Sequence, residues 1–146
     1  MKILLNYADG KFAQSQAKNS QSGLLAGFNV IYQMSRNEID AQFALKNAAI
    51  LSQKRGAGYW LWKAYFINQL LLRMSELDVL FYSDSGSIFV RRVDPLFETV
   101  LNDPQGVLCF ELAGKHVERS WTKRDVFLHL RSEEHTSELQ SPMFIS

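Results

Sequence analysis

The segment 79–82 constrains the fold of this chain more than any other. It is a short apolar run, Val-Leu-Phe-Tyr, that ends abruptly in small and acidic residues at 83–86. A run of this kind is typical of a strand buried on both faces, and such strands occur in parallel sheets that are covered by helices. We therefore expect an α/β fold in which this strand is central and Asp84 lies just past its carboxyl end.

Other segments predict strands that alternate with helices, which is the pattern of a mostly parallel, Rossmann-like sheet flanked by helices. The expected strands cover residues 2–7, 28–32, 79–82 and 106–112. The expected helices begin near residues 36, 59, 94 and 120–122. The polar segment from 12 to about 26 could form either a helix or a mobile loop.

Two local signals support the first two of these helices. Ser35 can cap a helix, and Glu38 three residues later completes a capping box. The second helix, expected over about 59–74, should bury an apolar face. The residues of that face are Trp62, Phe66, Leu70 and Met74.

Two segments together suit a ligand with a phosphate chain. Residues 55–63 hold two glycines, two cationic side chains and three aromatic rings. Ligands of open α/β sheets bind at the carboxyl ends of the strands, where Asp84 is expected. A carboxylate there can hold a divalent ion that neutralises phosphate oxygens, while arginine, lysine and aromatic faces suit a nucleotide. The sequence therefore predicts a nucleotide site.

These segments resemble a family of glycosyltransferases. The pattern Arg-Gly-x-Gly-Tyr-Trp-x-Trp-Lys at 55–63, then a helix, then an apolar strand ending in Tyr-x-Asp-x-Gly at 82–86, resembles nucleotide-sugar-dependent enzymes with the GT-A fold. The segment Glu-Arg-Ser-Trp-Thr-Lys-Arg-Asp at 118–125 fits the same family. The resemblance covers about residues 1–130. It departs from the family at Ala64, where proline is usual, and at Gly86, where many members have a second aspartate.

The resemblance implies transfer of a hexose from a nucleoside diphosphate sugar to a sugar or glycan acceptor. A divalent ion, Mn²⁺ or Mg²⁺, held by Asp84 would stabilise the departing diphosphate. The catalytic base would lie beyond residue 130. The implied donor- and acceptor-binding residues are Arg55, Tyr59, Trp60, Lys63, Ser83, Asp84, Ser85, Gly86, Trp121, Lys123 and Asp125.

Several of these residues also have an ordinary structural interpretation. Ser83, Asp84 and Ser85 could simply form a turn, since their side chains bond nearby backbone amides. Arg55 and Lys63 could lie on a solvated helix end, and the segment at 121–125 could be a helix start. Gly86 in place of a second acid also leaves open a non-catalytic nucleotide- or sugar-binding α/β module.

Residues 131–146 do not resemble the rest of the chain. The stretch Arg-Ser-Glu-Glu-His-Thr-Ser-Glu-Leu-Gln-Ser is a direct translation of a common DNA-sequencing adapter. We therefore expect 131–146 to be an artefactual tail, which is set aside in arguments about the fold. Residues 1–130 would then be the N-terminal, donor-binding part of a longer glycosyltransferase domain, and the chain as given would be inactive as a transferase.

Charge and hydropathy exclude several other classes of protein. Residues 1–130 contain 15 Lys and Arg and 12 Asp and Glu, so their net charge is +3, which is compatible with a small anionic ligand and too weak to predict nucleic-acid binding. The longest apolar stretch is interrupted by Asn68 and Gln69 and is too short to span a membrane. The N-terminus lacks the pattern of a signal peptide, so we expect a cytoplasmic protein. The single cysteine, Cys109, is expected to be a core residue.

Overall fold

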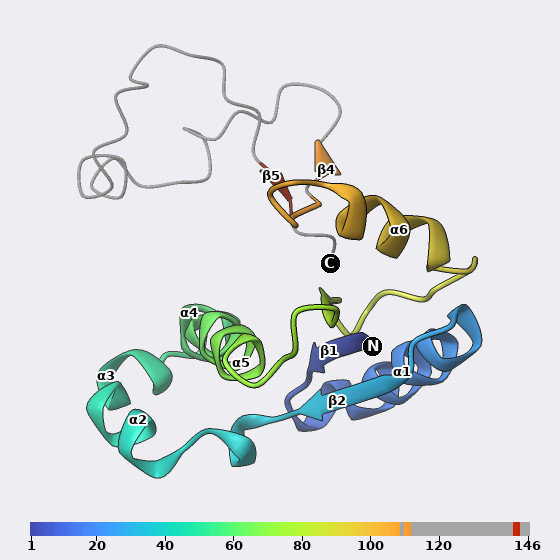
Figure 1. Cartoon of the computed structure of the whole chain (residues 1–146). Helices are drawn as coiled ribbons and strands as arrows, with labels where there is room; N and C mark the ends of the chain where they lie inside the picture. Colours follow the sequence, from blue (N-terminus) through green and yellow to red (C-terminus); the bar gives the residue numbers. More distant parts are fainter. Residues whose placement is uncertain (109, 112–141, 144–146) are drawn as a thin grey trace. The chain divides into compact units, whose positions relative to one another are not determined.

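The computed structural model describes residues 1–108, 110–111 and 142–143 (Figure 1). The chain divides into two compact units, and the first, Met1–Val107, contains all the helices and the larger sheet of the described residues. In the second unit, β4 (Phe110–Glu111) pairs in antiparallel fashion with β5 (Pro142–Met143). Of the strand expected over 106–112, residues 110–111 form a strand, residues 106–108 do not, and residues 109 and 112 lie outside the described residues. Cys109 and the helix expected after residue 120 lie outside the described residues.

The first unit is built on a three-stranded parallel sheet in the order β2-β1-β3. Its strands are β1 (Lys2–Tyr7), β2 (Val30–Met34) and β3 (Val79–Tyr82). Leu4 lies opposite Ile31 of β2 on one side and Phe81 of β3 on the other. The α/β class and the parallel sheet are thus confirmed.

Among the described strands, β3 does not have the central position expected for it. Among the described strands β1 is central and β3 lies at an edge. Five consecutive residues of β1, from Ile3 to Tyr7, are buried, whereas three of the four residues of β3 are only half-buried. Near-continuous burial follows from pairing on both sides together with coverage of both faces. The run in β1 is less apolar because it contains Asn6, which is why the sequence pointed to β3 instead.

Helices cover both faces of this sheet. Leu4 packs with Ala26 of α1 (Ala13–Ala26) and Phe97 of α6 (Asp94–Asn102). The next residue, Leu5, belongs to a second cluster with Phe66 of α5 (Leu61–Leu71). Successive residues of a strand point to opposite faces, so α1 and α6 cover one face and α5 covers the other.

The polar segment after β1 forms a helix, not a loop. A short 3-10 turn, η1 (Gly10–Phe12), leads into α1. The Phe28 N–H still bonds the Gly23 carbonyl at the end of α1. Phe28 therefore closes the helix and cannot join the sheet, and β2 begins two residues later than expected.

The helix expected after Ser35 is divided into three short pieces. The capping box exists, since the Ser35 N–H donates to Glu38 Oε2 at 2.6 Å and the Ser35 hydroxyl accepts from the Asn37 N–H. It caps only the 3-10 turn η2 (Arg36–Glu38). Asp40 then caps α2 (Ala41–Lys46), and α3 (Ala48–Leu51) follows. Asp40 is a second N-cap, and helices do not continue through such a residue.

The helix expected over 59–74 is shorter than predicted, because it begins two residues later and ends three residues earlier. The segment α4 (Gly56–Tyr59) precedes it, and α5 covers Leu61–Leu71. Trp62, Phe66 and Leu70 are buried on its inner face, as expected. Met74 lies beyond the end of α5 and is half-buried. This apolar face attaches α5 to the sheet and so determines where its first turn lies.

Candidate functional site

The loop 83–87 follows the carboxyl end of β3. The Ser83 N–H extends the sheet ladder to the Leu5 carbonyl at 3.0 Å. The Ser87 N–H then donates to the Asp84 carbonyl at 3.0 Å, which closes a turn. Asp84 therefore does begin a turn through its backbone, while its side chain remains 48% exposed. The carboxylate is available for other contacts.

Three side chains meet at this point, and we call Lys63, Tyr82 and Asp84 the Asp84 cluster. The Lys63 ammonium lies 3.4 Å from Asp84 Oδ1, and the Tyr82 hydroxyl donates to the same oxygen. The ammonium also lies 4.4 Å from the centre of the Tyr82 ring. Burial of the phenol, and then its hydrogen bond to Asp84, raise the pKa of Tyr82 far above its usual value. Tyr82 therefore stays protonated and remains a donor.

The Asp84 cluster contributes little to stability. The Lys63 side chain is 32% exposed and the Asp84 side chain 48% exposed. Ion pairs this accessible to water contribute about 0–1 kcal/mol. The arrangement joins a residue of α5 to one that follows β3, so its charges lie at the carboxyl edge of the parallel sheet, where ligands of such sheets bind.

The described residues at this site do not fit a divalent ion. Within the described residues no group of three or more His, Cys, Asp or Glu side chains lies together. Asp84 is a single carboxylate, and one of its oxygens already faces an ammonium and a hydroxyl donor. Calcium takes six to eight oxygen ligands, and magnesium requires near-octahedral geometry. The expected Mn²⁺ or Mg²⁺ site at Asp84 is therefore not supported by the described donor set.

Buried polar side chains under the loop were missed from the sequence. Asn19 of α1 donates to Ser83 Oγ at 3.0 Å and to the Ser87 carbonyl at 2.9 Å, so it holds both ends of the loop. Asn6 of β1 donates in turn to Asn19 Oδ1 at 2.7 Å and to Ser20 Oγ at 2.9 Å. The sequence signal that could have revealed them was Asn6, an asparagine inside a mostly apolar strand, because a buried polar group requires hydrogen-bond partners.

The two serines predicted to contact ligand both make hydrogen bonds that hold this loop. Ser83 and Ser85 are both buried. The Ser83 hydroxyl accepts from Asn19, and the Ser85 hydroxyl donates to the Tyr7 carbonyl at the end of β1. The Ser83 hydroxyl therefore attaches the loop to α1, and the Ser85 hydroxyl attaches it to β1. Gly86 is exposed, and a Cβ placed there would meet no atom within 4 Å, so the structure does not require glycine at this position.

The Gly-x-Gly of the first motif forms a left-handed turn. Every residue of the segment 56–60 has a positive φ, including Ala57, Tyr59 and Trp60. Non-glycine residues pay roughly 1–2 kcal/mol each in this region, and such strain clusters at functional sites. Gly58 has a φ of 102°, which favours glycine. A side chain is also excluded there by space, since a Cβ would lie 2.8 Å from Leu51 Cα.

This turn presents two aromatic side chains to solvent. Tyr59 is 54% exposed and Trp60 47% exposed. The Arg55 guanidinium lies 5.9 Å from the centre of the Trp60 ring. Trp62, in contrast, is buried, and its Nε1–H donates to the Gly56 carbonyl at 3.0 Å. The structure thus brings Arg55 to Trp60 and Lys63 to Asp84. Trp121, Lys123 and Asp125 lie outside the described residues.

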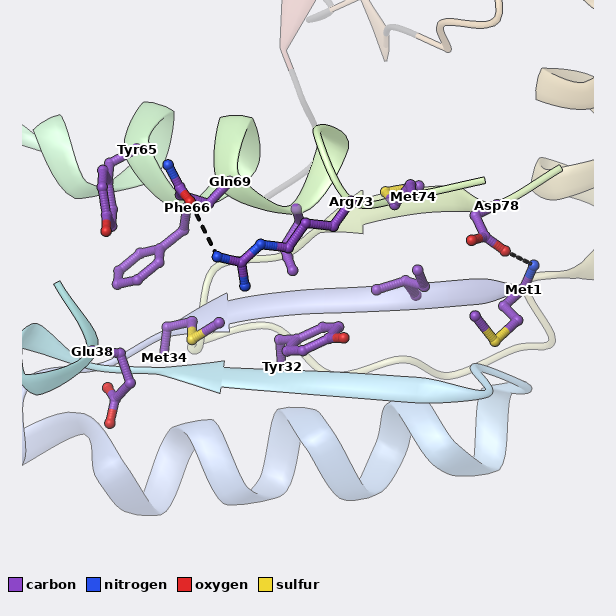
Figure 2. Close-up of a pocket in the computed structure, with 12 residues that line it drawn as sticks. Met1, Tyr32, Met34, Glu38, Tyr65, Phe66, Gln69, Arg73, Met74 and Asp78 are labelled. Atoms are coloured by element: carbon purple, nitrogen blue, oxygen red, sulfur yellow. Dashed lines mark hydrogen bonds and ion pairs between the residues drawn. The ribbon is translucent and has the colours of Figure 1, made fainter. Parts of the chain in front are cut away.

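A separate hollow of about 190 Å³ lies between α5 and the strands β1 and β2 (Figure 2). Tyr65, Phe66 and Gln69 line it from α5, and Tyr32 and Met34 line it from β2. None of the residues predicted from the motifs lines this hollow. Its remaining lining residues are Met1, Ile3, Glu38, Leu70, Arg73, Met74 and Asp78.

Comparison of the chain with protein-family models, with curated proteins and with solved structures found no match. The glycosyltransferase resemblance is therefore carried by the sequence motifs. In the part of the chain that the structure describes, no helix is both long and apolar enough to cross a membrane.

Proposed function

We propose that this chain binds a nucleoside diphosphate sugar at the carboxyl edge of its parallel sheet, as the donor-binding part of a GT-A-type hexosyltransferase. The observation that carries the proposal is the half-exposed ion pair of Lys63 and Asp84 just past the end of β3. Charges at this edge of an α/β sheet meet ligands more often than charges elsewhere on such a fold.

The diphosphate would lie beside Lys63. This residue belongs to the first turn of α5, an eleven-residue helix whose amino end carries partial positive charge. An ammonium and a helix N-terminus at one place both favour an anion. When the sugar leaves, negative charge builds up on the diphosphate, and cationic groups that are already in position stabilise it.

The base or the sugar would stack on the exposed aromatic residues of α4. Tyr59 and Trp60 supply faces of the kind that bind flat or apolar ligand surfaces. Arg55 lies against Trp60, where its guanidinium can reach a phosphate or a ring edge. The left-handed backbone supports this role, because strain of this kind is retained where a side chain must point in one direction.

A non-catalytic nucleotide-binding module is the second candidate. The observation that favours it is the single carboxylate of the Asp84 cluster, with Gly86 where many transferases of the resembled family have a second acid. Such a module would bind the same donor and leave it intact. The two candidates therefore differ in cleavage of the donor and not in its binding.

Calorimetric titration of the 146-residue chain tests the proposal. UDP-glucose, UDP-N-acetylglucosamine and GDP-mannose are titrated in manganese buffer, with uridine and guanosine as controls that lack the diphosphate. We expect at least one donor to bind more tightly than its nucleoside. If every donor binds no better than its nucleoside, the proposal fails. A longer protein, in which natural sequence replaces residues 131–146, distinguishes the two candidates. The transferase would release nucleoside diphosphate from the bound donor, and the binding module would not.

A further inference from the structure

We propose that the Lys63 ammonium takes the place of a divalent ion at the Asp84 cluster, so that the chain binds the donor diphosphate without metal. This inference rests on the proposed function and deepens it. It follows from the disagreement between the metal that the motifs imply and the side chains that surround Asp84.

The space beside the carboxylate already holds a cation. Lys63 Nζ lies 3.4 Å from Asp84 Oδ1, and the Tyr82 hydroxyl donates to the same oxygen. A divalent ion on this oxygen would have to displace both groups and would meet the charge of the ammonium. Within the described residues, no further acidic or histidine side chains gather here to offset that cost.

Two buried aromatic rings help to hold the Lys63 ammonium in position. It lies 4.4 Å from the centre of the Tyr82 ring and 5.9 Å from that of Trp62, and both rings are buried. Cations over aromatic faces within about 6 Å are attracted to them. Two rings and one carboxylate therefore restrict a side chain that is otherwise flexible.

Part of the ammonium remains free to bind a ligand. An ammonium has three N–H donors, and the contact with Asp84 uses one of them. The Lys63 side chain is 32% exposed, so the others can reach solvent or a phosphate oxygen. Lys63 is then the residue that contacts the diphosphate, and Asp84 and Tyr82 are positioning residues that act through it.

The test compares donor binding with and without metal. The donor that binds most tightly among UDP-glucose, UDP-N-acetylglucosamine and GDP-mannose is titrated into the 146-residue chain in EDTA and in manganese. We expect the two dissociation constants to agree within about twofold. Electron paramagnetic resonance of Mn²⁺ should show no ion bound to the wild-type chain under the conditions of the titration.

Variants of Lys63 identify the cation. Lys63→Met should weaken donor binding about 10- to 100-fold in EDTA, which is the loss expected for a hydrogen bond to a charged group. Lys63→Arg should restore most of the affinity. Lys2→Met is the matched control, because Lys2 also pairs with an aspartate, is 29% exposed and lies at the opposite end of the parallel sheet.

The outcomes separate this inference from the proposed function. Donor binding that requires manganese overturns the inference and leaves the proposed function intact. Unchanged affinity of Lys63→Met in EDTA also overturns it. Absence of donor binding in both buffers overturns both. Thermal unfolding of each variant is measured in parallel, and Lys63→Gln replaces Lys63→Met if the latter does not fold.

Discussion

The rings of Tyr7 and Trp62 stack with their centroids 3.8 Å apart and their planes 11° from parallel. This contact joins the last residue of β1 to the first turn of α5. Because Lys63 follows Trp62 directly, the same contact holds Lys63 at the carboxyl edge of the sheet, where it reaches Asp84. The apolar core thus positions the charged site.

Loss of this stack should be costly. Trp62→Ala should lower the free energy of unfolding by about 3–5 kcal/mol, the range for removing a large buried aromatic side chain. The control is Trp60→Ala, since Trp60 is 47% exposed and should cost less than about 1 kcal/mol. Urea unfolding measures both variants. Equal losses would show that Trp62 is not part of the core.

Removal of the Asn19 side chain should destabilise the protein, because Asn19 holds the loop that carries Asp84. Asn19→Ala removes the bonds to Ser83 and to the Ser87 carbonyl and leaves Asn6 without one acceptor. A buried group left unsatisfied costs about 1–3 kcal/mol, so we expect a loss in that range or above it. Gln14→Ala, at an exposed position of the same helix, should change stability by less than about 0.5 kcal/mol.

Two glycines should respond in opposite ways to alanine. Gly58 has a φ of 102°, and its Cβ would lie 2.8 Å from Leu51 Cα. Gly58→Ala should therefore destabilise by roughly 1–3 kcal/mol or more. Gly86→Ala meets open space, and we expect a change within about ±0.5 kcal/mol. Thermal unfolding of the two variants provides the comparison, and a tolerant Gly58 would contradict the left-handed turn.

Acid should weaken the contact between β1 and α6. Hydrogen bonds from Lys2, and then from Arg92, lower the pKa of Asp94 from 3.8 to about 2. A carboxyl whose folded pKa is depressed stabilises the fold above its unfolded pKa, and this contribution is lost as the pH falls from about 4 to about 2. The urea midpoint of the wild type should therefore fall more steeply over this window than that of Asp94→Asn. If the urea midpoints of the two proteins fall in parallel with pH, protonation of Asp94 is not linked to folding.

The elements predicted best from the sequence are those with a strong local pattern. Strand β1 covers the expected residues 2–7 and β3 the expected residues 79–82. Trp62, Phe66 and Leu70 are buried at the expected helical spacing. These features depend on periods of 2.0 and 3.6 residues, which are visible within a short window of sequence. The capping box at Ser35 was likewise a local signal, and it is present.

Local patterns could not predict how the elements pair. Nothing within residues 79–82 indicates that β1, and not β3, is the strand paired on both sides among the described strands. The left-handed turn at 56–60 is held by contacts with Leu51 and by the Trp62 side chain. Asn6 and Asn19 are thirteen residues apart and meet only when α1 packs on the sheet.

The candidate site shows the same division. From the amino-acid sequence alone, Lys63 and Asp84 were each predicted to contact a donor, and Asp84 was expected to hold a metal ion. Only the tertiary structure brought them 3.4 Å apart, through the stacking of Trp62 on Tyr7 and the parallel pairing of β1 with β3. Residue type determines which charges a chain can offer, but the electrostatic effect of one charge on another depends on their separation and on the surrounding solvent. Those two quantities exist only once the chain has folded.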